Sequence, residues 1–167
     1  LILGEADAGP PNVLDQLRKI MVDFRIVPET HDAQGIIRKT ICIGKILGIA
    51  DEILNLKLKE LRSDIETLKN TINFNKKKKK ILLILMIRGT SPIIAGSNTA
   101  GDGFIKMTGN LNAVNDVKGW KPVGTESILA IDPDVIIITK RGFSGFKNAN
   151  EFLVQNGLNL TKAGKTG

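Results

Sequence analysis

Residues 119–143 have the sequence GWKPVGTESILAIDPDVIIITKRGF, and this stretch decides the fold. The residues up to Gly124 predict a loop, and the apolar run at 128–131 predicts a short helix that ends in a tight turn at Asp132-Pro133-Asp134. The four β-branched residues at 135–138 are bounded by turn residues, a pattern typical of a strand buried on both faces of a parallel sheet. Because a helix that leads into such a strand is half of an α/β unit, the stretch predicts an α/β protein.

The segments before this stretch predict further elements of the same class. We expect a strand end at Leu1–Leu3, a helix from Pro10-Pro11 and a short strand at Phe24–Val27. Two successive helices follow, at about 32–47 and 51–73, and the apolar residues 81–87 predict another buried strand. Beyond the central stretch, we expect a helix near 150–155 and no regular structure from residue 160 onward.

This order of elements predicts two α/β lobes that are joined by one long helix. Residues 1–32 would be a remnant of an N-terminal α/β lobe, and residues 33–75 a helical region that contains the long helix at about 51–73. Residues 76–167 would form a C-terminal α/β lobe. Since the chain opens in mid-strand, with an unpaired edge, we also expect the N-terminal lobe to be incomplete.

The long helix has apolar residues at a spacing of four and three, which leaves two interpretations open. The seam consists of Leu54, Leu58, Leu61, Ile65, Leu68 and Ile72. Such a heptad seam could form a coiled-coil dimer, which would make the protein a helical interaction module. The favoured alternative is a long helix that packs on a globular body.

The composition is that of a globular chain of 167 residues, 42% of them hydrophobic and 25% charged. The net charge of +7 arises largely from the lysine run at 76–80, for which a solvated charge run is the favoured interpretation. With one Trp, six Phe and no Tyr, the chain lacks the aromatic pattern of nucleic-acid binders. The apolar segment after the lysines is far shorter than the ~20 residues of a membrane span.

Candidate catalytic and metal-binding residues are few. The single Cys42 and single His31 can form neither a disulfide framework nor a metal cluster, so we expect no catalytic residues and no metal site. Ala163–Thr166 resembles part of a phosphate-binding loop but has Asn159 where that motif needs Gly. The glycine-rich segment 95–103 could offer backbone N–H groups to an anion, or could serve close packing instead.

Two loops remain as candidates for ligand binding. One contains Arg88, Gly89 and Thr90 after the strand at 81–87, and the other contains Lys140 and Arg141 after the strand at 134–138. Ligands of parallel α/β sheets bind outside the carboxyl ends of the strands, and Arg suits carboxylate groups. A small, largely apolar ligand with peripheral carboxylates would be compatible with these loops, and surface loops without a ligand are an equal alternative.

Several segments, in the same order, resemble those of haem-binding periplasmic proteins. These are the substrate-binding components of hemin ABC importers, in the class III periplasmic-binding-protein clade that also binds cobalamin and siderophores. KPVGTESILAIDPDVIIITKRGF resembles the signature of their C-terminal lobe, and LILGEADAGPPNVLDQLRK resembles an N-terminal strand, loop and helix. IIAGSNTAGDGFIKMTGNLNAV and the residues Thr161, Ala163, Gly164 and Lys165 also resemble family segments.

The resemblance implies a non-enzymatic protein that binds haem in a cleft between its lobes and delivers it to an inner-membrane ABC permease. Haem would be the transported ligand and not a catalytic cofactor, and the parent protein would be periplasmic and not membrane-spanning. Arg88, Thr90, Lys140 and Arg141 would line the cleft, with the two arginines near the haem propionates. Glu126 matches the family's surface glutamate that docks into the permease. The alternatives are a cobalamin or siderophore binder of the same clade, or a fragment of a cytoplasmic α/β enzyme.

The sequence departs from the family pattern at the iron ligand. The family's axial Tyr would precede residue 1, and this chain contains no Tyr. We therefore expect a chain truncated at both ends that does not bind haem tightly by itself.

Overall fold

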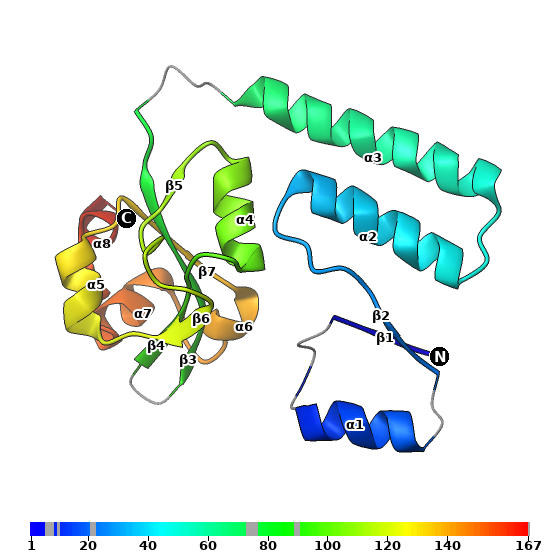
Figure 1. The fold of residues 1–167 in the computed structure, drawn as a ribbon. Helices are drawn as coiled ribbons and strands as arrows, with labels where there is room; N and C mark the ends of the chain where they lie inside the picture. Colours follow the sequence, from blue (N-terminus) through cyan, green and yellow to red (C-terminus); the bar gives the residue numbers. More distant parts are fainter. Residues whose placement is uncertain (6–8, 10, 21–22, 73–76, 89–90, 167) are drawn as a thin grey trace. The chain divides into compact units, whose positions relative to one another are not determined.

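The computed structural model describes residues 1–5, 9, 11–20, 23–72, 77–88 and 91–166. They divide into two compact units, Leu1–Thr71 and Ile72–Gly167, which are considered separately below (Figure 1). Both units contain helices and a sheet with parallel strand pairs, so the predicted α/β class is confirmed.

The first unit begins with a strand, a helix and a second strand, as the sequence predicts. β1 (Ile2–Gly4) and β2 (Phe24–Ile26) pair in parallel, and α1 (Pro11–Lys19) connects them. α2 (Ala33–Ile46) begins at Asp32, whose carboxylate caps the helix by accepting a hydrogen bond from the Gly35 N–H.

α3 (Asp51–Thr71) is the long helix that the heptad pattern predicts, and it packs on α2. Leu54 and Leu58 of α3 are buried in one cluster with Ile37 of α2, and the next seam residues, Leu61 and Ile65, are partly buried against that cluster. Leu68, further along the same seam, is exposed. The first half of the seam therefore serves packing inside this unit.

The second unit is built on β3 (Lys80–Arg88), whose two faces are both covered. Leu82 and Ile84 point to one side, where they pack with α5 (Thr125–Ile131), α7 (Ala149–Gln155) and η1 (Leu158–Leu160). Ile81 and Leu83 point to the other side, against Ile105 of α4 (Ala100–Met107). Successive side chains of a strand alternate between its faces, so one apolar run serves two cores. Figure 1 shows α4 and the α5–α7 pair on opposite sides of the sheet.

The strand predicted from the central stretch is confirmed as β7 (Val135–Ile138). It pairs in parallel with β3 from Ile81↔Val135 to Ile84↔Ile138, and each of its residues is half-buried. Its side chains contact the cores on both faces of the sheet, but β3 and not β7 is the more deeply buried strand.

β4 (Ser91–Ala95) pairs antiparallel with β3, and residues 89–90 of the predicted loop lie outside the described part of the chain. Three expectations about the second unit were wrong. Trp120–Pro122, expected in a loop, forms β6 against β4, and Leu111–Asn112 forms β5 against β3. The loop after β7 is a short helix, α6 (Lys140–Phe143), and the end of the chain contains α8 (Lys162–Thr166). These short elements depend on partners distant in sequence, which local patterns do not reveal.

The packing of α3 on α2 predicts a large effect for one leucine of α3 and a small effect for another. Leu58 is 4% exposed and Leu56 is 57% exposed. We expect Leu58→Ala to lower the free energy of unfolding by about 2–5 kcal/mol, because it leaves a cavity in a packed cluster. Leu56→Ala should change it by less than ~1 kcal/mol. Urea denaturation followed by circular dichroism measures both, and equal effects would show that the seam does not face α2.

Candidate functional site

The carboxyl ends of β3 and β7 lie at the same edge of the sheet, because the two strands are parallel and in register. β3 continues past the end of β7, and α6 packs beside this extension. A Cβ on Gly142 of α6 would lie 2.7 Å from the carbonyl oxygen of Leu85 and 2.9 Å from the Cα of Met86. Only glycine allows this close approach of α6 to β3.

Thr139 fixes the junction between β7 and α6. Its hydroxyl donates a hydrogen bond to the carbonyl of Leu85 (2.6 Å) and accepts one from the N–H of Gly142 (3.0 Å). The same residue thus caps α6 and ties it to β3. Lys140 and Arg141 follow directly and are exposed, so the edge presents two cations on a well-anchored turn.

The other two predicted cleft residues are only partly described. The backbone of Arg88 ends β3 and pairs with Ser91 of β4, while its side chain is outside the described part of the structure. Thr90 lies outside the described residues. The structure therefore brings the backbone of β3 together with the turn that carries Lys140 and Arg141, and does not test the predicted roles of the four side chains.

Glu126 is exposed in the first turn of α5, where the helix dipole favours a carboxylate. The helix below it is firmly held. Ile128 is fully buried in the core, and the hydroxyl of Thr125 donates to the carbonyl of Asn156 at 3.1 Å. At the other end of α5, the Asp132 carboxylate accepts the backbone N–H of Lys162 at 2.8 Å and its ammonium group at 3.0 Å. The glutamate thus stands on a rigid support.

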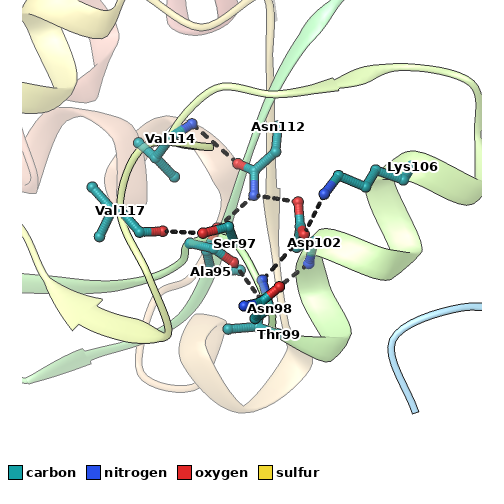
Figure 2. A network of polar contacts seen from close by, with 10 residues as sticks. Ala95, Ser97, Asn98, Thr99, Asp102, Lys106, Asn112, Val114 and Val117 are labelled. Atoms are coloured by element: carbon teal, nitrogen blue, oxygen red, sulfur yellow. Dashed lines mark hydrogen bonds and ion pairs between the residues drawn. The ribbon is translucent and has the colours of Figure 1, made fainter.

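A buried polar network that the sequence reasoning missed connects α4, β4 and β5 (Figure 2). The Asp102 carboxylate accepts hydrogen bonds from the Asn112 amide (3.0 Å), the Asn98 N–H (3.3 Å) and the Lys106 ammonium group (2.7 Å). The Asn112 amide also donates to the carbonyl of Ala95 at 3.0 Å. The sequence signal for part of this network is the spacing of Thr99 and Asp102, which is a helix-capping pattern.

The network shows that the glycine-rich segment 95–103 serves packing. The N–H groups of Asn98 and Asp102 are already bonded within the segment. A Cβ on Gly96 would lie 2.1 Å from the carbonyl oxygen of Val117, and one on Gly101 would lie 2.5 Å from the Cβ of Ala95. The contacts therefore favour the packing interpretation over an anion site.

The pKa of the Asp102 carboxyl reflects two opposing effects. Burial raises it, but the hydrogen bonds from Lys106 and Asn112, the charge of Lys106 and the N–H of Asn98 together hold the pKa below its ordinary value of 3.8. The carboxylate is therefore ionised at neutral pH although its side chain is buried.

The described residues hold no group of three or more His, Cys, Asp or Glu side chains that could bind a metal ion. Among the same residues, no helix has both the length and the apolar character needed to cross a membrane.

Comparison with known proteins identifies similar molecules. The family described as periplasmic binding protein matches residues 1–167. The haem-binding protein BhuT, solved with two haems, is 26% identical with a TM-score of 0.83, over 98% of this chain and 62% of that one. RhuT from Roseiflexus sp. RS-1 is 25% identical with a TM-score of 0.84, over 98% of this chain and 63% of that one. HutB of Vibrio cholerae is 24% identical with a TM-score of 0.79 and shares the fold, over 98% of this chain and 63% of that one. A search of proteins with curated descriptions found no match.

The lowered pKa of Asp102 predicts how this residue contributes to stability as the pH changes. As the pH falls, the unfolded chain binds the proton before the folded one, so the contribution is complete above the ordinary pKa and is lost as the pH falls through the folded pKa. We expect Asp102→Asn to lower the free energy of unfolding by about 1–3 kcal/mol at neutral pH, with a smaller difference from the unsubstituted chain below pH 3.8.

Denaturation curves recorded across this acid range test the prediction. Asp116→Asn, at an exposed carboxylate in the loop after β5, is the matched control and should change the free energy of unfolding at neutral pH by less than ~1 kcal/mol. If the deficit of the Asp102 variant stayed constant down to the lowest pH, the ionised carboxylate would not be the source of the stability.

Proposed function

This chain belongs to the periplasmic binding protein family, and we propose that it is the haem-binding component of an ABC importer, acting in the periplasm without catalysing a reaction. The observation that carries the proposal is the match of the family along the whole chain, together with haem-binding relatives of 25–26% identity. The chain spans about 63% of the length of these solved relatives, so its ligand and partners are part of the proposal. Haem is the cargo and not a catalytic cofactor.

The second unit contributes a cationic wall for the haem. We assign this wall to Arg88, Thr90, Lys140 and Arg141, at the carboxyl ends of β3 and β7. Haem carries two propionates, and Arg can bind a carboxylate through two parallel hydrogen bonds. The Thr139 anchor supports this role, because a fixed turn loses less conformational entropy when it binds an anion.

Glu126 is proposed to dock on the permease of the inner membrane. A carboxylate that is exposed, at a helix start and on a rigid support can pair with a basic pocket on a partner. The same family membership favours a binding protein over the alternative of a cytoplasmic enzyme. Cobalamin and siderophores remain alternative cargoes, and the haem-binding relatives favour haem.

Titration of the 167-residue chain with hemin tests the cationic wall. We expect weak binding without the Soret shift of tight iron coordination, because the chain has no Tyr. Lys140→Glu together with Arg141→Glu should weaken the affinity about tenfold or more, as expected from the loss of charge-assisted hydrogen bonds.

Two controls separate this effect from a general effect of charge. Lys118→Glu with Lys121→Glu makes the same charge change at and beside β6, at the sheet edge opposite to β7, and should leave hemin binding nearly unchanged. Hemin dimethyl ester, which has no free carboxylates, should bind the chain and the Lys140/Arg141 variant equally. Equal weakening of hemin by both double substitutions would rule out the wall, and stoichiometric coordination would contradict the expected lack of an iron ligand.

The docking role of Glu126 predicts a transport defect without a binding defect. In cells that depend on this importer for haem, Glu126→Arg should reduce uptake about tenfold or more, because a like charge then faces the basic pocket of the permease. Hemin affinity of the purified variant should not change. Asp116→Arg, at an exposed position in the loop after β5, reverses the charge of a carboxylate elsewhere and should transport haem normally; if Glu126→Arg did so too, Glu126 would have no docking role.

A further inference from the structure

The amino end of β3, opposite to the proposed haem edge, carries a dense group of lysines around a hollow. The hollow has a volume of about 480 Å³. Six polar residues line it together with neighbouring backbone, and they are Lys78, Lys80, Lys106, Asn110, Asn112 and Asn115. No carboxylate is among its described lining residues, so its wall is cationic.

The lysine run that enters β3 is held in place by its backbone. The N–H of Lys79 donates to the Asn110 side chain at 3.0 Å, and the carbonyl of Lys79 accepts from Leu111 at the same distance. The N–H of Lys80 donates to the Asp134 carboxylate at 2.8 Å, and its carbonyl accepts from the Asp134 N–H at 2.9 Å. These bonds fix where the side chains of the run begin.

An extended backbone sends successive side chains to opposite sides, so this run supplies lysines to two hollows. Lys78 and Lys80 line the first. Lys77 and Lys79 line a second hollow of about 600 Å³, which Lys78 also borders and to which Lys162 and Lys165 contribute. Asp134 is the one carboxylate among the described residues that line this second hollow.

The first hollow offers ammonium groups as its main free donors. Both amide hydrogens of Asn112 are engaged, by Ala95 and Asp102, and the amide of Asn110 donates to Thr108. Lys106 is held at the rim by the Asp102 carboxylate. An ammonium group has three donors and no acceptor, and like charges gathered at one site repel each other. A bound anion of high charge would relieve that repulsion.

We propose that this hollow is a binding site for a small ligand that bears phosphate groups. Lysine binds phosphate as a point charge, and a diphosphate carries enough charge for several lysines at once. A concave wall of this size admits such a group more readily than an extended polymer, which would need a continuous surface. The phosphate could belong to a soluble metabolite or to a lipid headgroup, since both present the same chemistry to the lysines.

The site is independent of the proposed haem wall, because the two lie at opposite ends of β3. Inorganic pyrophosphate, titrated into the 167-residue chain by calorimetry, is the probe. We expect saturable binding that is about tenfold or more weaker in Lys78→Gln with Lys80→Gln, since each substitution removes a charged donor. Lys118→Gln with Lys121→Gln removes the same charge at the β6 edge and should bind pyrophosphate as the unsubstituted chain does.

Further measurements identify the source of the phosphate and guard against misfolding. Lys78 lies before β3, so the single substitution Lys78→Gln should weaken pyrophosphate binding and leave the circular dichroism spectrum unchanged. Vesicles of phosphatidylcholine with phosphatidylglycerol should compete with pyrophosphate if the ligand is a headgroup, and should not bind if it is soluble. The absence of saturable pyrophosphate binding, or equal weakening in both double variants, would overturn the proposal.

Discussion

The burial of β3 on both of its faces is the constraint on which the second unit depends. Leu82 and Ile84 enter one core and Ile81 and Leu83 the other, so α4 on one side and α5, α7 and η1 on the other are stabilised by the same four residues. Such a strand cannot slip by one residue without exchanging its two faces. The position of β3 therefore determines where β7, and with it the turn at Thr139, can lie.

The sequence was sufficient for elements whose signals are local. The β-branched run at 135–138 and the heptad spacing of the long helix each identify an element from neighbouring residues alone. β6 could not be recognised in this way, because Trp-Lys-Pro becomes a strand only by pairing with β4. α8 likewise begins where the distant Asp132 accepts the N–H of Lys162. At the candidate site, the position of Lys140 and Arg141 after β7 could be predicted from the sequence. The short helix that carries them, and its packing against β3, could not.

The two ends of β3 have different chemistry. At its carboxyl end, Lys140 and Arg141 of α6 lie beside β7. The haem-binding relatives are the reason for proposing haem as the ligand at this end. At its amino end, lysines from the entering strand and from α4 surround a hollow. The polar network of Asp102 lies between α4 and the sheet and holds Lys106 in place, so burial of one carboxylate orders part of that second surface.

The close fit of Gly142 against Leu85 and Met86 also determines the register of β7 on β3. If β7 moved along β3 by two residues, its alternation of faces would be preserved. The cations after β7 would then move by roughly 7 Å, at about 3.3 Å per residue. The glycine and the Thr139 hydroxyl accept only one position on β3, so the placement of charge at this edge is set by steric fit.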